Sequence, residues 1–296
     1  MPQLLELFVN GIAVGCIYSL IGLGFTMIIR STGILNFAQG EMVMLGAMFG
    51  LSALALFPLP FPAVLLIGMV GAGAASVFIE LFVYRTMRVR RVPLINIIIA
   101  TVGMSLVVQN VSQLVWGSEP IAYPSLLGRG AYTFGSIKLS PQIVWIIALA
   151  FILMVLLQLF LRFTRAGLAM EATAQDPEAA QLMGINLTRS IAYTFGIAGM
   201  MAGAAGVLMG SLFFASFNMG FLPGLKAFIA ATLGGLGSIG GAIVGGIILG
   251  LLETFGAVWI SSSYKDAIGM VILIVILLIV PQGLVGLVRS NRGLSR

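Results

Sequence analysis

Eight long runs of apolar residues, separated by breaks that contain the polar residues, limit most strongly what this chain can fold into. Each run is close to the roughly 20 residues that a helix needs to cross the hydrocarbon core of a bilayer. Only 8% of the residues are charged, whereas soluble domains carry about 25%. The runs are Leu4–Ile29, Glu41–Phe57, Ala63–Tyr84, Leu94–Trp116, Ile143–Phe163, Ile191–Phe214, Ile239–Ile260 and Ala267–Val288.

These runs favour helices over a β-barrel. They are rich in glycine, and they do not alternate polar with apolar residues as barrel strands do. Helices and closed barrels are the only folds that satisfy every backbone hydrogen bond in lipid. We therefore expect an all-α polytopic membrane protein, with residues 1–296 forming a single transmembrane domain.

The arginines predict the orientation of the chain. They gather after the first run, after the third run, on both sides of residues 165–189 and in the C-terminal tail. The positive-inside rule places these four sites in the cytoplasm, so the N-terminus and the loop Gly117–Ser140 are expected outside. This distribution explains the net charge of +6 without an anionic partner such as nucleic acid. The arginines are Arg30, Arg85, Arg88, Arg90, Arg91, Arg162, Arg165, Arg189, Arg289, Arg292 and Arg296.

This orientation requires an odd number of crossings, which eight runs do not supply. The glycine-rich segment Pro223–Gly237 offers an explanation, because a broken helix is tolerated at membrane depth where protein or a cavity surrounds it. We expect eight to nine transmembrane helices, with a broken or re-entrant segment near residues 223–240. The alternative is a C-terminal tail outside the cell despite its arginines.

The polar segment 165–189 interrupts the apolar second half of the chain and contains a predicted short helix. An aspartate can cap its free N–H groups, a proline fits its first position, and a glycine can end it in a left-handed turn. A helix of about two turns at the membrane surface suits the docking of a soluble partner. The residues expected to form this coupling element are Asp176, Pro177, Glu178, Ala179, Ala180 and Gly184.

Polar side chains within the apolar runs are the second group of candidates. They are costly in lipid, and they mark either a translocation pathway or a paired structural site. The pathway candidates are Asn36, Gln39, Glu41, Gln109, Asn110, Gln113 and Glu253.

Each pathway candidate has a structural alternative. The cluster from Asn36 to Glu41 is also compatible with a hydrogen-bonded entry into the second span. Gln109 and Gln113 share one helix face, where hydrogen bonds between helices are an alternative to a pore lining. Glu253 suits either role. For a further acid, Glu80, the expectation is an ion pair with Arg85 at the end of the helix.

Nothing in the sequence predicts an enzyme. The chain has no histidine and one cysteine, so histidine catalysis and cysteine or histidine metal sites are not expected. The segment Gly220–Ala227 contains glycines and a lysine but lacks the spacing and the Ser/Thr of a phosphate-binding loop. We expect no cofactor in this chain.

Several motifs resemble one transporter family. Glu178-Ala-Ala-x-x-x-Gly184 resembles the EAA loop of ABC importer permeases. This motif and four further segments together resemble the LivH-type permeases of branched-chain amino acid importers. The resemblance covers nearly the whole chain. The segments are Asn36-Phe-Ala-Gln-Gly-Glu41, Gln109-Asn110, Lys226-Ala-Phe-x-Ala-Ala-x-Leu-Gly-Gly-Leu-Gly-Ser-Ile-x-Gly-Ala242 and Tyr264-Lys265-Asp266. One departure is Gln39, where the family pattern has histidine.

The resemblance implies a multi-pass subunit in a bacterial plasma membrane, the inner membrane in a Gram-negative cell. It implies four partners: a second, LivM-like permease, two cytoplasmic ATPases that use ATP and Mg, and a periplasmic or lipid-anchored binding protein. The implied function is import of branched-chain or other hydrophobic amino acids by alternating access. Urea or amides are alternative cargoes. A gradient-driven secondary transporter using Glu41 and Glu253 is the alternative from another class.

Overall fold

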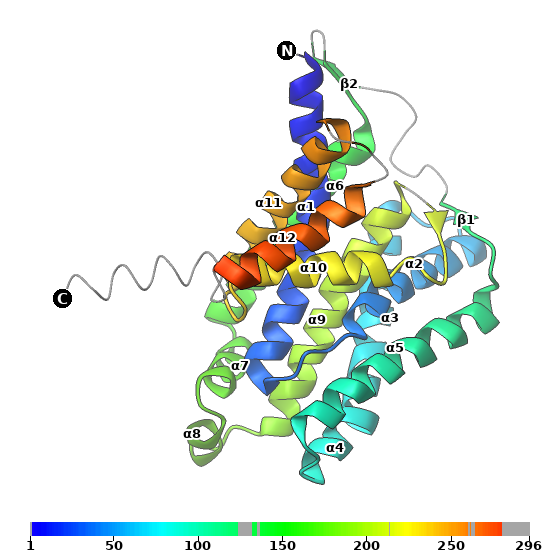
Figure 1. The fold of residues 1–296 in the computed structure, drawn as a ribbon. Coiled ribbons are helices and arrows are strands. Elements are labelled where there is room, and N and C mark those ends of the chain that lie inside the picture. Colours follow the sequence, from blue (N-terminus) through cyan, green and yellow to red (C-terminus); the bar gives the residue numbers. More distant parts are fainter. Residues whose placement is uncertain are drawn as a thin grey trace.

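The computed structural model describes residues 2–123, 132–134, 137–212, 214–259, 261 and 264–279, and within them the chain is helical (Figure 1). The helices are α1 Pro2–Thr32, α2 Gln39–Leu56, α3 Phe61–Ile79, the π-helix η1 Glu80–Tyr84, α4 Arg85–Val89, α5 Leu94–Trp116, α6 Pro141–Phe163, α7 Arg165–Gln175, α8 Pro177–Leu182, α9 Leu187–Gly210, α10 Phe221–Gly234, α11 Ile239–Trp259 and α12 Lys265–Ile279. Four short strands are β1 Ile121–Ala122, β2 Tyr132–Phe134, β3 Ile137–Leu139 and β4 Phe214–Ala215.

Seven of the described helices are long and apolar enough to cross a membrane, which confirms the all-α polytopic prediction. They include α1, α2, α5, α6, α9 and α11, and a continuous stretch formed by α3, η1 and α4. The predicted run Ala267–Val288 begins as α12, and its part beyond Ile279 lies outside the described residues, as do the arginines of the tail.

The broken segment is a short helix that folds back on its successor. The apolar helix α10 has 14 residues and ends before Gly235. A Cβ atom added to Gly234 would lie 1.9 Å from the carbonyl oxygen of Gly241, and one on Gly245 would lie 2.1 Å from that of Ala230. Helices α10 and α11 therefore form a tight antiparallel hairpin. This hairpin lies where the glycine-rich segment predicted a broken or re-entrant helix.

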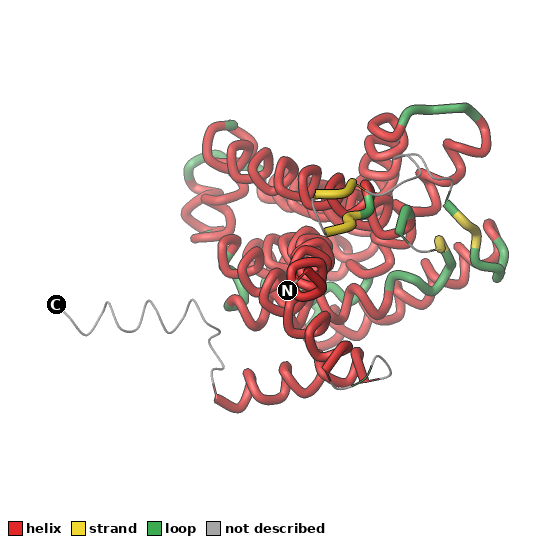
Figure 2. The backbone as a smooth tube through the Cα atoms, turned by 90° about the horizontal axis from the view of Figure 1, so that it is seen from above, coloured by secondary structure: helices red, strands yellow, loops and turns green. Residues whose placement is uncertain are grey.

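The two ends of the molecule differ in chemistry. Figure 1 shows α4, α7 and α8 at one end, with the N-terminus and strands β1 and β2 at the other. The arginines of α4 and those around α7 and α8 thus share one end, as the positive-inside rule predicts. In the end-on view of Figure 2 the strands lie on the side toward the viewer, the end from which α1 projects.

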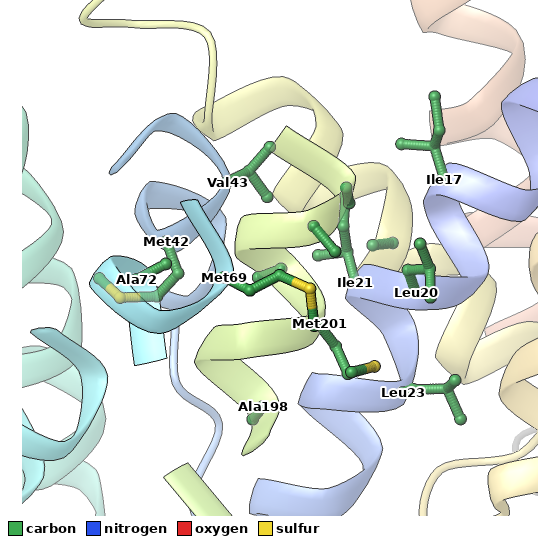
Figure 3. Packing of buried hydrophobic residues seen from close by; sticks show 14 of the residues in the cluster. Ile17, Leu20, Ile21, Leu23, Met42, Val43, Met69, Ala72, Ala198 and Met201 are labelled. Atoms are coloured by element: carbon green, nitrogen blue, oxygen red, sulfur yellow. The ribbon is translucent and has the colours of Figure 1, made fainter. Parts of the chain in front are cut away.

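Helix α9 is at the centre of the core, where it packs against α1, α2 and α3. Figure 3 shows Ile21 and Leu23 of α1, Met42 and Val43 of α2 and Met69 of α3 around it. The outer helices α5 and α6 are much less buried than α1. The buried share of the apolar part is 83% in α1, 17% in α5 and 22% in α6. The apolar faces of α5 and α6 therefore remain for lipid or another subunit.

Two loops meet at the end that carries the strands. Ile121 pairs with Ala215 in the antiparallel ladder of β1 and β4, which joins the loop after α5 to the loop after α9. The hydroxyl of Tyr123 donates a hydrogen bond of 2.7 Å to the carbonyl of Ala47 in α2. Burial raises the pKa of Tyr123, which keeps its hydroxyl a donor. Strands β2 and β3 form a separate hairpin in which Thr133 faces Lys138.

Glu80 corrects one expectation from the sequence. Its carboxylate pairs with Arg88 rather than with Arg85. The π-helix η1 inserts one extra residue into the turn after Glu80. Residue 88 then returns to the face of Glu80 after two turns, a place that residue 87 takes in an uninterrupted α-helix.

The contact between α2 and α9 depends on two glycines. A Cβ atom on Gly46 would lie 2.3 Å from the Cα atom of Gly203, so we expect Gly46→Ala to destabilise the protein by about 1–3 kcal/mol through overpacking. The matched control is Gly103→Ala on the exposed side of α5, where nothing lies within 4 Å. This control should be neutral or stabilising by up to about 1 kcal/mol, since alanine is the better helix former. Unfolding of the purified variants in mixed detergent micelles, followed by circular dichroism, measures both, and equal effects would contradict the prediction.

Candidate functional site

The short helix predicted between residues 165 and 189 is present as α8. The Oδ1 atom of Asp176 accepts hydrogen bonds from the backbone N–H groups of Glu178 at 3.0 Å and Ala179 at 2.9 Å. At the other end Gly184 has a φ of +83°. Its N–H donates to the carbonyl of Gln181, and the next N–H donates to the carbonyl of Ala180, each at 3.0 Å. This pattern is a Schellman motif, which confirms the predicted start and end of the helix.

The sequence did not predict a second helix in this segment. Helix α7 precedes α8 and begins at its cap Thr164, whose hydroxyl accepts from the N–H of Gly167 at 3.0 Å. The carboxylate of Glu171 on α7 accepts two hydrogen bonds from the guanidinium of Arg30, at 2.5 and 3.3 Å. Bidentate pairs of this kind hold both distance and angle. The coupling segment is thus fastened to the end of α1.

The outer surface of the coupling segment is apolar at its tip. Leu182 is 89% exposed and Met183 is 85% exposed, while Glu178 and Ala179 are exposed beside them. Ala180 is buried and faces the protein. Two exposed apolar side chains on a rigid, capped helix form a suitable contact for a soluble partner.

A first buried polar cluster occupies the break between α1 and α2. Asn36 accepts a hydrogen bond of 3.1 Å from the hydroxyl of Tyr84 and one of 3.2 Å from the N–H of Ala38. The amide nitrogen of Gln39 donates to the carbonyl of Ala198 in α9 at 2.9 Å. The structure therefore brings Asn36 and Gln39 into one hydrogen-bonded entry to α2, the structural alternative expected from the sequence.

Glu41 belongs to the same entry. Its Oε1 atom accepts a hydrogen bond of 2.9 Å from the hydroxyl of Ser105 in α5, and its side chain is 1% exposed. Within the described part of the chain, its Oε2 atom and the Oε1 atom of Gln39 have no hydrogen-bond partner. A buried carboxylate is costly in a membrane, and one without full pairing is a candidate for function. A pathway role for Glu41 therefore stays a prediction.

The α5 candidates lie apart from this cluster. Asn110 is exposed, and its amide donates to the carbonyl of Leu106 in its own helix at 2.7 Å. Gln109 and Gln113 are partly exposed, and neither makes a hydrogen bond to another helix within the described ranges. These three side chains face the side on which α5 is uncovered.

A second buried cluster forms around Lys226, which the sequence did not single out as a site residue. Its ammonium lies 2.8 Å from Oε1 of Glu253 and 2.7 Å from Oδ1 of Asp266. The hydroxyl of Tyr18 donates to Oε2 of Glu253 at 2.8 Å. The cluster joins α1, α10, α11 and α12, with Lys226 and Glu253 buried and Asp266 exposed. The available signal was a single lysine within the predicted broken segment.

The fold and these sites define a multi-pass α-helical membrane protein with an exposed, capped short helix at one end and charged clusters between its helices. Comparison with known proteins identifies the family. The profile of the branched-chain amino acid transport system permease component matches residues 7–280, and the chain belongs to this family. This finding confirms the resemblance seen in the motifs and the location as a multi-pass inner-membrane protein.

Individual relatives agree. The chain is 38% identical to the high-affinity branched-chain amino acid transport system permease protein LivH of Escherichia coli K12, over 95% of each chain. It is 37% identical to the corresponding permease protein BraD of Pseudomonas aeruginosa PAO1, over 97% of this chain and 98% of the relative. A galactose/methyl galactoside import permease protein, MglC of Haemophilus influenzae, is 30% identical over 55% of this chain and 51% of its own length. No solved structure matches the chain.

The second cluster yields a stability prediction. Lys226→Met leaves the buried carboxylate of Glu253 without its cation, and we expect a loss of about 3–5 kcal/mol. Adding Glu253→Gln should restore at least half of the loss, because the amide carries no charge. Adding Asp266→Asn to Lys226→Met should restore little, because the Asp266 side chain is 59% exposed. Unfolding of the three variants in detergent measures their stabilities. A Lys226→Met, Glu253→Gln double variant no more stable than Lys226→Met alone would contradict the prediction.

Proposed function

We propose that this chain is the permease subunit of an ATP-driven importer that moves branched-chain or other hydrophobic amino acids into the cytoplasm by alternating access. The observation that carries the proposal is the capped helix α8, exposed at its tip and fastened through α7 to the core. The names of LivH and BraD support the cargo class. Residues 1–296 act as one transmembrane domain, and residues 165–189 are its coupling loop.

The partners follow from the surfaces of this chain. Two cytoplasmic ATPases, which bind ATP and Mg, dock on the coupling loops of the two permeases, here at Leu182 and Met183. A second, LivM-like permease and membrane lipid cover the uncovered apolar faces of α5 and α6, where Gln109, Asn110 and Gln113 lie. A periplasmic or lipid-anchored binding protein delivers the amino acid to the opposite end.

The coupling residues have separate roles in this proposal. Asp176 and Pro177 start α8, Gly184 ends it, and Ala179 with Glu178 faces the ATPase. Closure of the ATPase dimer moves α8, and the ion pair between Arg30 and Glu171 carries that motion into α1. The energy comes from other chains, so this subunit needs only contacts that differ between its two states.

The break before α2 is the proposed place where those contacts change. Asn36, Gln39 and Glu41 hold a non-helical turn at membrane depth by few hydrogen bonds, and two of their polar atoms are left free within the described residues. Such a segment has a second arrangement within reach, because moving it lets these free atoms find partners. Glu253 acts at the pathway through the cluster around Lys226.

A reconstitution tests the energy source and the cargo. Proteoliposomes that hold both permeases and both ATPases, supplied with the binding protein outside, should accumulate leucine only when ATP is enclosed. This chain alone should take up nothing under a proton or sodium gradient. Uptake by the single chain under a gradient would instead support a secondary transporter using Glu41 and Glu253. Uptake of urea or amides but not leucine would overturn the proposed cargo.

Gly184 offers a test of the coupling helix by backbone shape alone. Nothing lies within 4 Å of a Cβ atom added there, so a side chain meets no steric obstacle. Valine at this left-handed position costs about 1–2 kcal/mol, whereas asparagine tolerates it. We expect Gly184→Val to lower ATP-driven uptake by about 5–30-fold, the equivalent of that energy, and Gly184→Asn to retain it. Assembly and basal ATP hydrolysis are measured in parallel, and equal uptake in both variants would count against a coupling role for the α8 end.

A further inference from the structure

A cavity of about 360 Å³ lies beside the cluster around Lys226. It is bounded by α1, the end of α9, the start of α10 and the start of α12, which gather on one side of the molecule (Figure 1). Most of its wall is apolar, with Val14, Ile17, Met219 and Leu222 among the lining residues. Its polar lining includes Tyr18, Lys226 and Asp266. Pockets for small molecules have this combination of an apolar wall and a few polar groups, in a size range of roughly 300–1,000 Å³.

The charges at the polar end do not cancel. Lys226 and Glu253 form a buried pair, and the hydroxyl of Tyr18 holds the second oxygen of that carboxylate. Asp266 adds a second carboxylate to the same ammonium. One cation therefore faces two anions, and the surplus negative charge lies on Asp266, whose side chain is 59% exposed.

This arrangement has one donor and one acceptor to offer a ligand. A lysine ammonium can donate to three acceptors, and two carboxylates lie within ion-pair distance of this one. Lys226 lines the cavity, so a ligand carboxylate there is in place to become the third acceptor. Asp266 still has room for an ammonium, because only its Oδ1 atom contacts Lys226. The two groups are adjacent, which suits a ligand whose own opposite charges are adjacent.

We propose that this cavity is a binding station for an α-amino acid zwitterion with a branched aliphatic side chain. The α-ammonium pairs with Asp266, the α-carboxylate accepts from Lys226, and the aliphatic side chain lies against Ile17, Met219 and Leu222. An amine without a carboxylate, or an acid without an ammonium, leaves one of the two charges unanswered, so the site selects the zwitterion. The proposal rests on the proposed function as an amino acid importer and names where the cargo binds within this subunit.

The position of the station gives it a place in the transport cycle. Met209, in the last turn of α9, lines the cavity. This turn leads to β4, which pairs with β1 at that end of the molecule. The arginine distribution places this end outside, so the station receives the amino acid before it passes the centre of the membrane. Lys226 lies in α10 and pairs with Glu253 of α11, so it links the two helices of the hairpin. A ligand bound to Lys226 therefore contacts the broken segment directly.

Photolabelling tests the site directly. The assembled transporter in lipid nanodiscs, without nucleotide, is incubated with photo-leucine, a diazirine analogue that keeps both charges of leucine, and then irradiated. Peptide mass spectrometry should find the label on the segments that contain Ile17 or Met219 and Leu222. Excess leucine should compete, whereas 4-methylpentanoate and isopentylamine, which each lack one charge, should not.

Variants of Asp266 provide the second measurement. In ATP-driven uptake, Asp266→Asn should raise the half-saturating leucine concentration by about tenfold, the effect of one charge-assisted hydrogen bond, and should weaken labelling at a limiting photo-leucine concentration. Asp266→Glu keeps the charge and should recover most of the affinity. Glu119→Gln removes an exposed carboxylate from the loop after α5 and is the matched control, expected to stay within about twofold.

The outcomes separate the site from the function. A complex that accumulates leucine with ATP but carries label only outside the cavity, or is unaffected by Asp266→Asn, overturns the site and leaves the importer function standing. A complex that assembles and hydrolyses ATP but accumulates no leucine overturns the proposed cargo, and the site with it.

Discussion

Close packing of helix backbones is the constraint on which the rest of this structure depends. In a bilayer, lipid is as apolar as leucine, so helices associate through van der Waals contact and a few polar bonds. The contact of Gly46 with Gly203 and the hairpin contact of Gly234 with Gly241 bring backbones together at the core. The helices so positioned then hold the polar clusters, because a carboxylate such as Glu253 remains in place only when a neighbouring helix supplies its partner.

The same core links the two ends of the molecule. Helix α1 carries Arg30 at the end that holds the coupling segment and Tyr18 further along, beside the cluster around Lys226. Helix α9 begins next to the coupling segment and ends beside the cavity. A displacement at α8 therefore has two continuous helices through which to reach the station proposed for the amino acid. Packed helices shift between discrete arrangements rather than deform smoothly, which suits a two-state cycle.

Local features were predictable from the sequence. Asp176, Pro177 and Gly184 determine α8 through bonds that span only a few residues, so their residue types alone indicated the start and the end of the helix. The apolar runs predicted the spans, and the glycines of residues 223–240 predicted the break. The expected partner of Glu80 was wrong, because a residue five positions on lies about 140° around an α-helix, whereas Arg88 returns to the face of Glu80 after the inserted π-turn.

The sequence by itself determined the class of protein and the bounds of the capped helix α8, since composition and helix caps depend on residue type and near neighbours. The tertiary structure decided which charges meet. Tyr18 and Glu253 are 235 residues apart in the chain, and Arg30 and Glu171 are 141 apart. No periodicity indicates such pairs, because they depend on how helices α1, α7, α10, α11 and α12 pack. The same packing placed Lys226 of α10 and Asp266 of α12 at one cavity.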